Sequence, residues 1–131
     1  MNHYLLESHC IFPSEDIQKT ADFYEQKMGF RAAPYLNSKE PHICLYRDST
    51  EIILIRTNGK KFTPNRELYG YGYDAYFITK NQEELQEELI QSNVNIIHPL
   101  NNTDYGNKEF VVEDIDGRWI AFGIKTMQEK S

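Results

Sequence analysis

Residues 105–117 read Tyr-Gly-Asn-Lys-Glu-Phe-Val-Val-Glu-Asp-Ile-Asp-Gly, and this stretch decides the fold class. The run at 109–113 is centred on Phe-Val-Val, which predicts a strand. The Asp-Ile-Asp-Gly sequence that follows predicts a tight turn, because Asp and Gly adopt the backbone angles that turns require. Residues 118–124 then return as a second strand. The C-terminal part of the chain is therefore predicted to end in a β-hairpin.

The segment that precedes this hairpin adds a strand, a helix and another strand. Residues 73–79 predict a strand, and a helix follows in which Leu85 and Leu89 lie four residues apart, with Asn81 as its candidate cap. Residues 95–98 predict the next strand. The second half of the chain thus has the order βαβββ.

The first half has the same order. Residues 16–28 predict a helix, with Ser14 as the candidate N-cap and Gly29 as the stop. Its apolar residues recur at steps of three and four: Ile17, Ala21, Tyr24 and Met28. The predicted strands are residues 4–12, 30–36, 42–47 and 51–57.

Two similar halves at an offset of about 64 residues indicate a duplicated unit. We predict an α+β fold in which residues 1–131 form one domain of two βαβββ modules. Module one covers residues 1–57 and module two residues 73–131, with a Gly- and Pro-containing linker at 58–72.

Composition excludes several classes of function. The 20 acidic and 14 basic residues give a net charge of -6, which disfavours nucleic-acid binding. No apolar run approaches the roughly 18 residues of a membrane span, and no secretory signal precedes the first strand. We therefore expect a cytoplasmic protein that does not bind membranes, with Cys10 and Cys44 as reduced core thiols.

Three stretches carry a resemblance to a known family. They are His9 seven residues before Asp16, the helix end with Phe23-Tyr24 and Met28-Gly29-Phe30, and the 105–117 stretch. The chain resembles the vicinal oxygen chelate superfamily, which includes glyoxalase I, extradiol dioxygenases, fosfomycin-modifying enzymes and bleomycin-resistance proteins. The 105–117 stretch is most similar to the bleomycin-resistance branch, with Lys108 in place of Arg and Ile115 in place of Pro.

The resemblance implies a cup-shaped, mostly antiparallel eight-stranded sheet with helices outside, in a homodimer. It also implies four metal-ligand positions, which fall on His9, on or beside Leu54, on Tyr73 and on Ala121. Only the first suits a divalent ion, because such a site needs several lone-pair donors. Shifting the second position to Glu51 or Arg56 does not replace the donor lost at Ala121. We expect no metal and no other cofactor.

The same positions predict an organic ligand site. If Ala121 faces the cup, Trp119 and Gly123 face it too, because side chains alternate along a strand. Ala121 and Gly123 are small and leave volume for a ligand, and the Trp119 ring forms an aromatic wall beside that volume. Leu54 and Arg56 are predicted to line the cup as well, Arg56 either as an anion clamp or as a solvated strand end. In the linker, Phe62, Tyr69 and Tyr71 either stack on a bound ring or pack against the sheet edge or a partner subunit.

His9 is the strongest candidate for chemistry. It acts either as a ligand-binding donor and general base or as a hydrogen-bonded strand residue. Glu7 lies two residues earlier on the same strand face, so the two are expected to pair, with Tyr73 as a further acid or base.

We predict a metal-independent protein that binds a small, planar aromatic molecule, nearest to antibiotic-resistance proteins that sequester a drug. One alternative is a glyoxalase-like lyase or isomerase, or a dioxygenase-type enzyme, that uses His9 with or without a divalent metal. A second alternative is an interaction module in which the duplication only builds a stable dimer.

Overall fold

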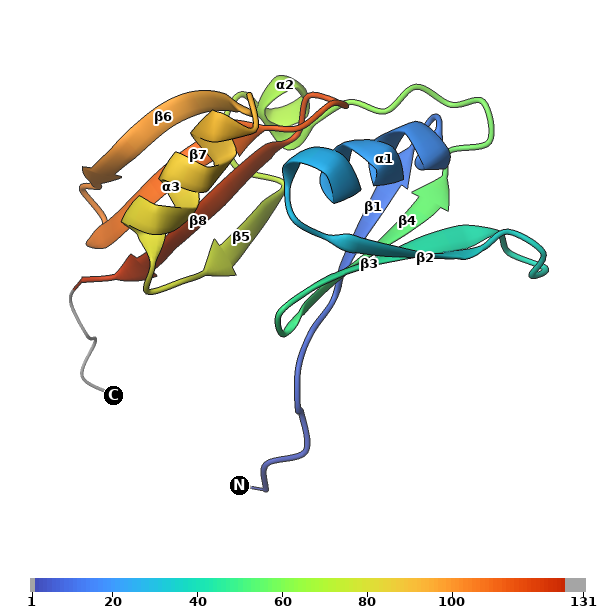
Figure 1. Cartoon of the computed structure of the whole chain (residues 1–131), viewed down its shortest axis with the longest axis horizontal. Helices are drawn as coiled ribbons and strands as arrows, with labels where there is room; N and C mark the ends of the chain where they lie inside the picture. The colour runs from blue at the N-terminus through green and yellow to red at the C-terminus, as the bar shows by residue number, and fades with distance from the viewer. Residues whose placement is uncertain (1, 127–131) are drawn as a thin grey trace. The chain divides into compact units, whose positions relative to one another are not determined.

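The computed structural model describes residues 2–126, which form two compact units that divide between Phe62 and Thr63. The N-terminal unit contains β1 (Cys10–Ser14), α1 (Ile17–Lys27), β2 (Arg31–Tyr35), β3 (His42–Arg47) and β4 (Thr50–Arg56) (Figure 1). The C-terminal unit contains α2 (Asn65–Tyr69), β5 (Ala75–Ile78), α3 (Gln82–Gln91), β6 (Asn95–Asn102), β7 (Asn107–Glu113) and β8 (Trp119–Lys125).

Both units have the same topology. The strand orders are β1-β4-β3-β2 and β5-β8-β7-β6, so the eight predicted strands are divided over two four-stranded sheets. In each sheet the first strand pairs in parallel with the last, and the other pairings are antiparallel. The predicted α+β class and the two βαβββ modules are confirmed. The short helix α2 lies in the predicted linker and was not expected there.

In the N-terminal unit, α1 covers one face of the sheet. Leu54 pairs with Phe12 and Ile43, and all three side chains are buried, as are the α1 residues Ile17 and Tyr24. Since side chains alternate along a strand, the neighbouring Ile53 lies on the opposite, open face of β4. This alternation fixes which residues are available to a ligand.

The start of α1 differs from the prediction. Asp16 caps the helix, with its Oδ1 accepting the Lys19 N–H at 3.1 Å, whereas Ser14 ends β1. The Ser14 hydroxyl instead accepts the Asp16 N–H at 3.2 Å and pairs with the Thr20 hydroxyl at 2.7 Å. The predicted end at Gly29 is confirmed, because this residue has φ of 74° and follows the last turn.

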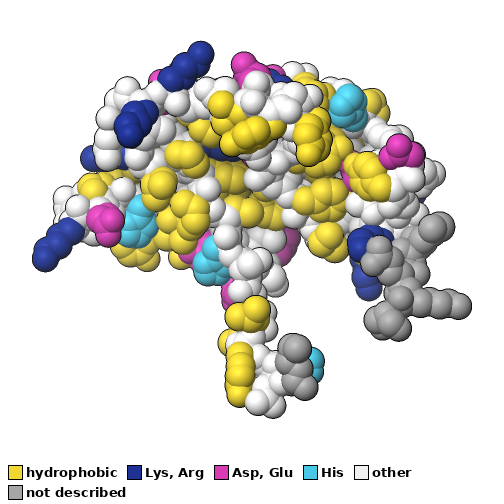
Figure 2. Space-filling model, turned by 180° about the vertical axis from the view of Figure 1, so that it is seen from behind, with side chains coloured by type: hydrophobic (Ala, Val, Ile, Leu, Met, Phe, Trp, Pro, Cys, Tyr) yellow, Lys and Arg dark blue, Asp and Glu magenta, His cyan; other side chains and the backbone are white. Residues whose placement is uncertain are grey.

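The predicted strand at 4–12 begins only at Cys10 and runs to Ser14. The preceding segment leaves the body of the N-terminal unit with hydrophobic side chains on its surface (Figure 2). Tyr4, Leu5 and Leu6 are 79%, 96% and 95% exposed. Its mixed polarity was interpreted as a strand, but pairing with β4 starts at the Cys10–Ile52 pair.

In the C-terminal unit, the side of the sheet that packs with α3 carries a stack of aromatic rings. The Phe122 ring lies 5.6 Å from Phe77 and 5.2 Å from Phe110 between ring centres. Leu89 of α3, Phe110 and Ile120 have no exposed surface. Residues 109, 111 and 113 of β7 and 119, 121 and 123 of β8 therefore lie on the other face.

Across residues 2–126, no helix combines the length and the apolar character that crossing a bilayer requires.

Candidate functional site

The C-terminal unit holds a pocket of about 660 Å³ with an aromatic lining. It is formed by α2, the segment that links α2 to β5, the loop before β7, and single residues of β6 and β8. Its lining residues are Arg66, Glu67, Gly70, Tyr71, Gly72, Tyr73, His98, Tyr105 and Trp119. This volume lies in the range of small-molecule sites, which are concave and largely hydrophobic with a few polar groups.

Trp119 is held rigidly at this pocket. The guanidinium of Arg66 lies 4.6 Å from the centre of the indole ring, and the His98 ring meets it edge-on at 5.5 Å. Arg66 is fixed in turn, because it donates to the Gly117 carbonyl and pairs with Glu113 at 3.1 Å. The predicted aromatic wall is therefore present, with its ring orientation set on two sides.

Beside this wall, a buried carboxylate accepts three tyrosine hydroxyls. Glu109 is 1% exposed, and its Oε2 accepts from Tyr105 at 2.6 Å and from Tyr73 at 2.7 Å. Its Oε1 accepts from Tyr76 at 2.9 Å. Within residues 2–126 no ion pair involves Glu109, so hydroxyl donors alone compensate its burial among the described groups.

The tyrosines of this cluster keep their protons at neutral pH. Burial raises the pKa of Tyr73 well above its ordinary value, and its contacts with Tyr105 and Glu109 raise it further. Burial and the hydrogen bond to Glu109 raise the pKa of Tyr76 in the same way. The pKa of Tyr105 is also raised, chiefly by burial. All three groups are therefore O–H donors to the carboxylate rather than phenolates.

The volume predicted at Ala121 and Gly123 is absent. Ala121 is fully buried, and a Cβ atom at Gly123 would lie 2.5 Å from Glu109 Cβ and 2.6 Å from the Tyr76 hydroxyl. Tyr76 and Glu109 fill the space that the small β8 residues leave, because Glu109 pairs directly with Gly123 across the β7–β8 ladder. The pocket lies instead at the Trp119 end of the strand.

His9 lies in the N-terminal unit with two carboxylates. Its Nε2 is 2.9 Å from Glu7 Oε2 and 3.3 Å from Glu51 Oε1. The structure thus brings the predicted Glu7 and His9 pair together and adds Glu51. Leu54 is corrected as a site residue, since it has no exposed surface beneath α1. Glu51 and Leu54 are three residues apart on β4, so they lie on opposite faces of the strand. Glu51 therefore reaches His9, whereas Leu54 is buried.

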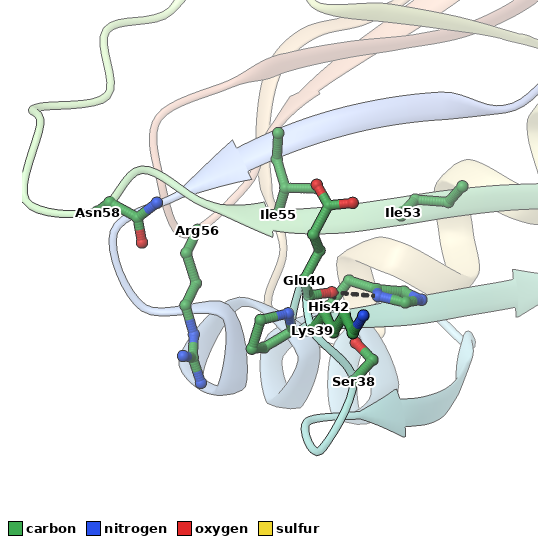
Figure 3. A pocket seen from close by; sticks show the side chains of 9 residues that line it. Ser38, Lys39, Glu40, His42, Ile53, Ile55, Arg56 and Asn58 are labelled. Atoms are coloured by element: carbon green, nitrogen blue, oxygen red, sulfur yellow. Dashed lines mark hydrogen bonds between the residues drawn. The ribbon is translucent and has the colours of Figure 1, made fainter.

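Arg56 lines a second pocket of about 810 Å³ in the N-terminal unit. Figure 3 shows its side chain projecting from the end of β4 on the side opposite Ile55 and away from His42. The His42 Nδ1 donates to the Glu40 carbonyl at 2.8 Å in the same pocket. Arg56 is exposed, which matches the solvated strand end that the sequence left open as an alternative. Phe62 lines neither of these pockets, and its N–H donates to Glu15 at 3.0 Å.

The side chains at the expected ligand positions do not fit a divalent ion within either unit. In the C-terminal unit, Tyr73 donates to Glu109, and the neighbouring Asp74 accepts the N–H groups of Asn65 at 3.1 Å and Trp119 at 3.0 Å. Both oxygens of Asp74 are therefore engaged with backbone. Among residues 2–126, no three His, Cys, Asp or Glu side chains are grouped so that they could hold a metal.

Tyr71, Tyr73 and Trp119 are thus the predicted residues that the structure brings together at this pocket. Sequence reasoning missed Glu109, Tyr105 and Arg66 as neighbours of this pocket. The one sequence feature that could have pointed to Glu109 is its position in the 105–117 stretch, where an acidic residue lies in the predicted strand next to Phe110 and two valines.

Comparisons with known proteins agree with this fold. A family model described as the Glyoxalase/Bleomycin resistance protein/Dioxygenase superfamily matches residues 7–122. The metallothiol transferase FosB of Lysinibacillus sphaericus (strain C3-41) is 24% identical over 124 residues, which cover 94% of this chain and 84% of the relative.

Two solved structures illustrate the structural likeness. TioX from Micromonospora sp. ML1 superposes with a TM-score of 0.66 at 18% identity, over 91% of this chain and 99% of that one. A glyoxalase/bleomycin resistance protein/dioxygenase from Alicyclobacillus acidocaldarius gives a TM-score of 0.71 at 17% identity, over 92% and 95% of the two chains. At these identities the likeness concerns the fold.

Proposed function

Because the chain belongs to the glyoxalase/bleomycin resistance protein/dioxygenase superfamily, we propose that it binds a planar aromatic small molecule in the C-terminal pocket and uses no resident metal to do so. The observation that carries the proposal is the aromatic lining with a fixed indole. Tyr71, Tyr73, Tyr105 and Trp119 all border the same pocket. Rigid rings that need no reordering are favourable partners for a flat ligand.

The proposal extends to sequestration of an antibiotic or another flat metabolite. The lining of the pocket contains no Ser, Thr, Cys or Lys nucleophile, and the Glu109 carboxylate beside it accepts tyrosine hydroxyls. Such a site holds a ligand by stacking and hydrogen bonding without changing it. The FosB relative is named as a metallothiol transferase. In residues 2–126 of this chain, no three His, Cys, Asp or Glu side chains are grouped so that they could hold a metal.

Intrinsic fluorescence tests this proposal, because Trp119 is the single tryptophan of the chain. We expect fused-ring aromatic compounds such as acridine to quench its emission and to raise the melting temperature. Replacing Tyr71, which is 80% exposed, by Ala should weaken binding by about two- to tenfold, since one aromatic contact contributes about 0.5–1.5 kcal/mol.

Tyr69→Ala provides the matched control. Tyr69 is 70% exposed on α2 but does not line the pocket, so this variant should bind like the parent protein. Equal affinities of the Tyr71→Ala and Tyr69→Ala variants would contradict the proposed location of the site.

A second function is favoured by the arrangement of His9 with Glu7 and Glu51. A histidine beside two carboxylates is a suitable general base for a glyoxalase-like lyase or isomerase, or a dioxygenase-type enzyme, with or without a divalent metal. Titration with Mn²⁺ or Zn²⁺, followed by calorimetry, tests the metal-assisted form.

We expect neither ion to bind with one-to-one stoichiometry. Stoichiometric binding that His9→Ala abolishes would favour the enzyme over the metal-independent binding protein. His42→Ala, in the same unit but outside the His9 group, serves as the control for nonspecific loss of an imidazole.

A further inference from the structure

We infer that the C-terminal pocket selects aromatic ligands that donate hydrogen bonds, cations above all, because Glu109 engages the hydroxyl protons of Tyr73 and Tyr105. This inference rests on the proposed function and assigns a ligand chemistry to the same pocket.

The hydroxyl protons of Tyr73 and Tyr105 are both used by Glu109. A phenol has one proton and two acceptor lone pairs. Tyr73 and Tyr105 each place that proton on Glu109 Oε2, at 2.7 Å and 2.6 Å, and their oxygens lie 3.2 Å apart. What the two hydroxyls offer to a ligand is therefore lone pairs. A tyrosine in water can turn either its proton or its lone pairs to a partner, whereas these two are fixed as acceptors.

The charges around the pocket act in the same direction. Arg66 is the one cationic side chain in the lining, and it pairs with Glu113 at 3.1 Å and approaches Glu67 at 3.8 Å. The Glu109 carboxylate, which contacts the lining residues Tyr73 and Tyr105, adds a third negative group beside the pocket. Lys108, next to Glu109 in sequence, pairs with Glu83 at 2.6 Å, and residues 108 and 109 alternate to opposite faces of β7. A cationic ligand gains attraction here that an anionic one does not.

The hydrogen bonds around Glu109 also keep the hydroxyl oxygens of Tyr73 and Tyr105 as acceptors toward a ligand. Glu109 is 1% exposed, and Tyr76 donates to its other oxygen while accepting from Asn107 at 2.9 Å. Turning the proton of Tyr73 or Tyr105 toward a ligand would remove a donor from a buried carboxylate, which is costly. Ligands that only accept hydrogen bonds therefore meet an unfavourable surface.

The test compares 9-aminoacridine with acridine at mildly alkaline pH. The two share three fused rings, but the first is a cation with N–H donors and the second is neutral with only an acceptor nitrogen. We expect 9-aminoacridine to bind at least about tenfold more tightly, as judged by Trp119 quenching and calorimetry, because hydrogen bonds that involve a charged group are about twice as strong as neutral ones.

Variants assign the preference to the cluster. Tyr105→Phe removes one acceptor and one of the three donors to Glu109, so its melting curve reports whether it folds, and the preference should fall by about three- to tenfold. Glu109→Gln should release the hydroxyl protons and lower the preference further, with its melting curve reporting whether it folds. Tyr69→Phe, which removes an exposed hydroxyl outside the pocket, should change nothing.

The outcomes separate the two proposals. Equal binding of the two acridines overturns the inference and leaves the proposed aromatic site standing. A preference that survives both Tyr105→Phe and Tyr73→Phe also overturns it. Failure of both compounds to bind overturns the proposed function and the inference together.

Discussion

Asp114→Ala is expected to lower the free energy of unfolding of the C-terminal unit by about 3–5 kcal/mol, because it removes the buried carboxylate that pairs with the buried Arg118 and leaves the partly exposed Asp116 beside that charge. Arg118 is 1% exposed, and its Nη1 lies 3.0 Å from Asp114 Oδ2. Asp114 Oδ1 also accepts the N–H groups of Asp116 at 2.9 Å and Arg118 at 3.0 Å. The substitution thus removes an ion pair and the acceptor that shapes the turn. Denaturant unfolding followed by Trp119 fluorescence measures the loss.

Asp116→Ala is the matched control for this turn. Its carboxylate lies 2.9 Å from the same Arg118 Nη1, but the side chain is 22% exposed and water replaces it more readily. We expect a loss of about 1 kcal/mol, typical of one partly exposed hydrogen bond. If Asp114→Ala stayed within that smaller range, the buried pair would not be the main support of the turn.

The strand and helix order was predictable from sequence because it depends on local patterns. The spacing of Ile17, Ala21 and Tyr24 gave α1 to within one residue at each end, and the β3 boundaries were predicted as observed. The prediction of Ser14 as the N-cap was wrong, because Asp16 also has a side chain that suits a cap and the path of β1 places Asp16 at the helix start. Helix α2 has five residues, too few to show a period.

The candidate site was less predictable because it depends on register. The prediction that Leu54 lies on the open face of β4 was wrong, because its side chain is buried. An error of one residue in the register of a strand is enough to move a side chain to the opposite face. Trp119 and Tyr73 were predicted as ligand-binding residues and lie together at the pocket, but their partners Glu109 and Tyr105 come from β7 and the loop before it. The homodimer and the cytoplasmic location stay predictions.

Gly123→Ala is expected to destabilise the C-terminal unit by about 1–3 kcal/mol, the usual cost of inserting a methyl group into packed structure. The new Cβ would lie 2.5 Å from Glu109 Cβ and 2.6 Å from both the Lys108 carbonyl oxygen and the Tyr76 hydroxyl. A backbone oxygen in a strand ladder cannot move away without disturbing the β7–β8 pairing. Thermal and denaturant unfolding measure the effect.

The double variant Gly123→Ala/Tyr76→Phe shows whether crowding is the cause. Removing the Tyr76 hydroxyl relieves one of the three close approaches, so the double variant should lose less stability than the sum of the single ones. Strict additivity, or a Gly123→Ala variant within about 0.5 kcal/mol of the parent, would contradict a tightly filled centre. Tight packing at Gly123 is also what keeps Glu109 in reach of its three tyrosines, so the same variant should weaken the preference for donor-bearing ligands.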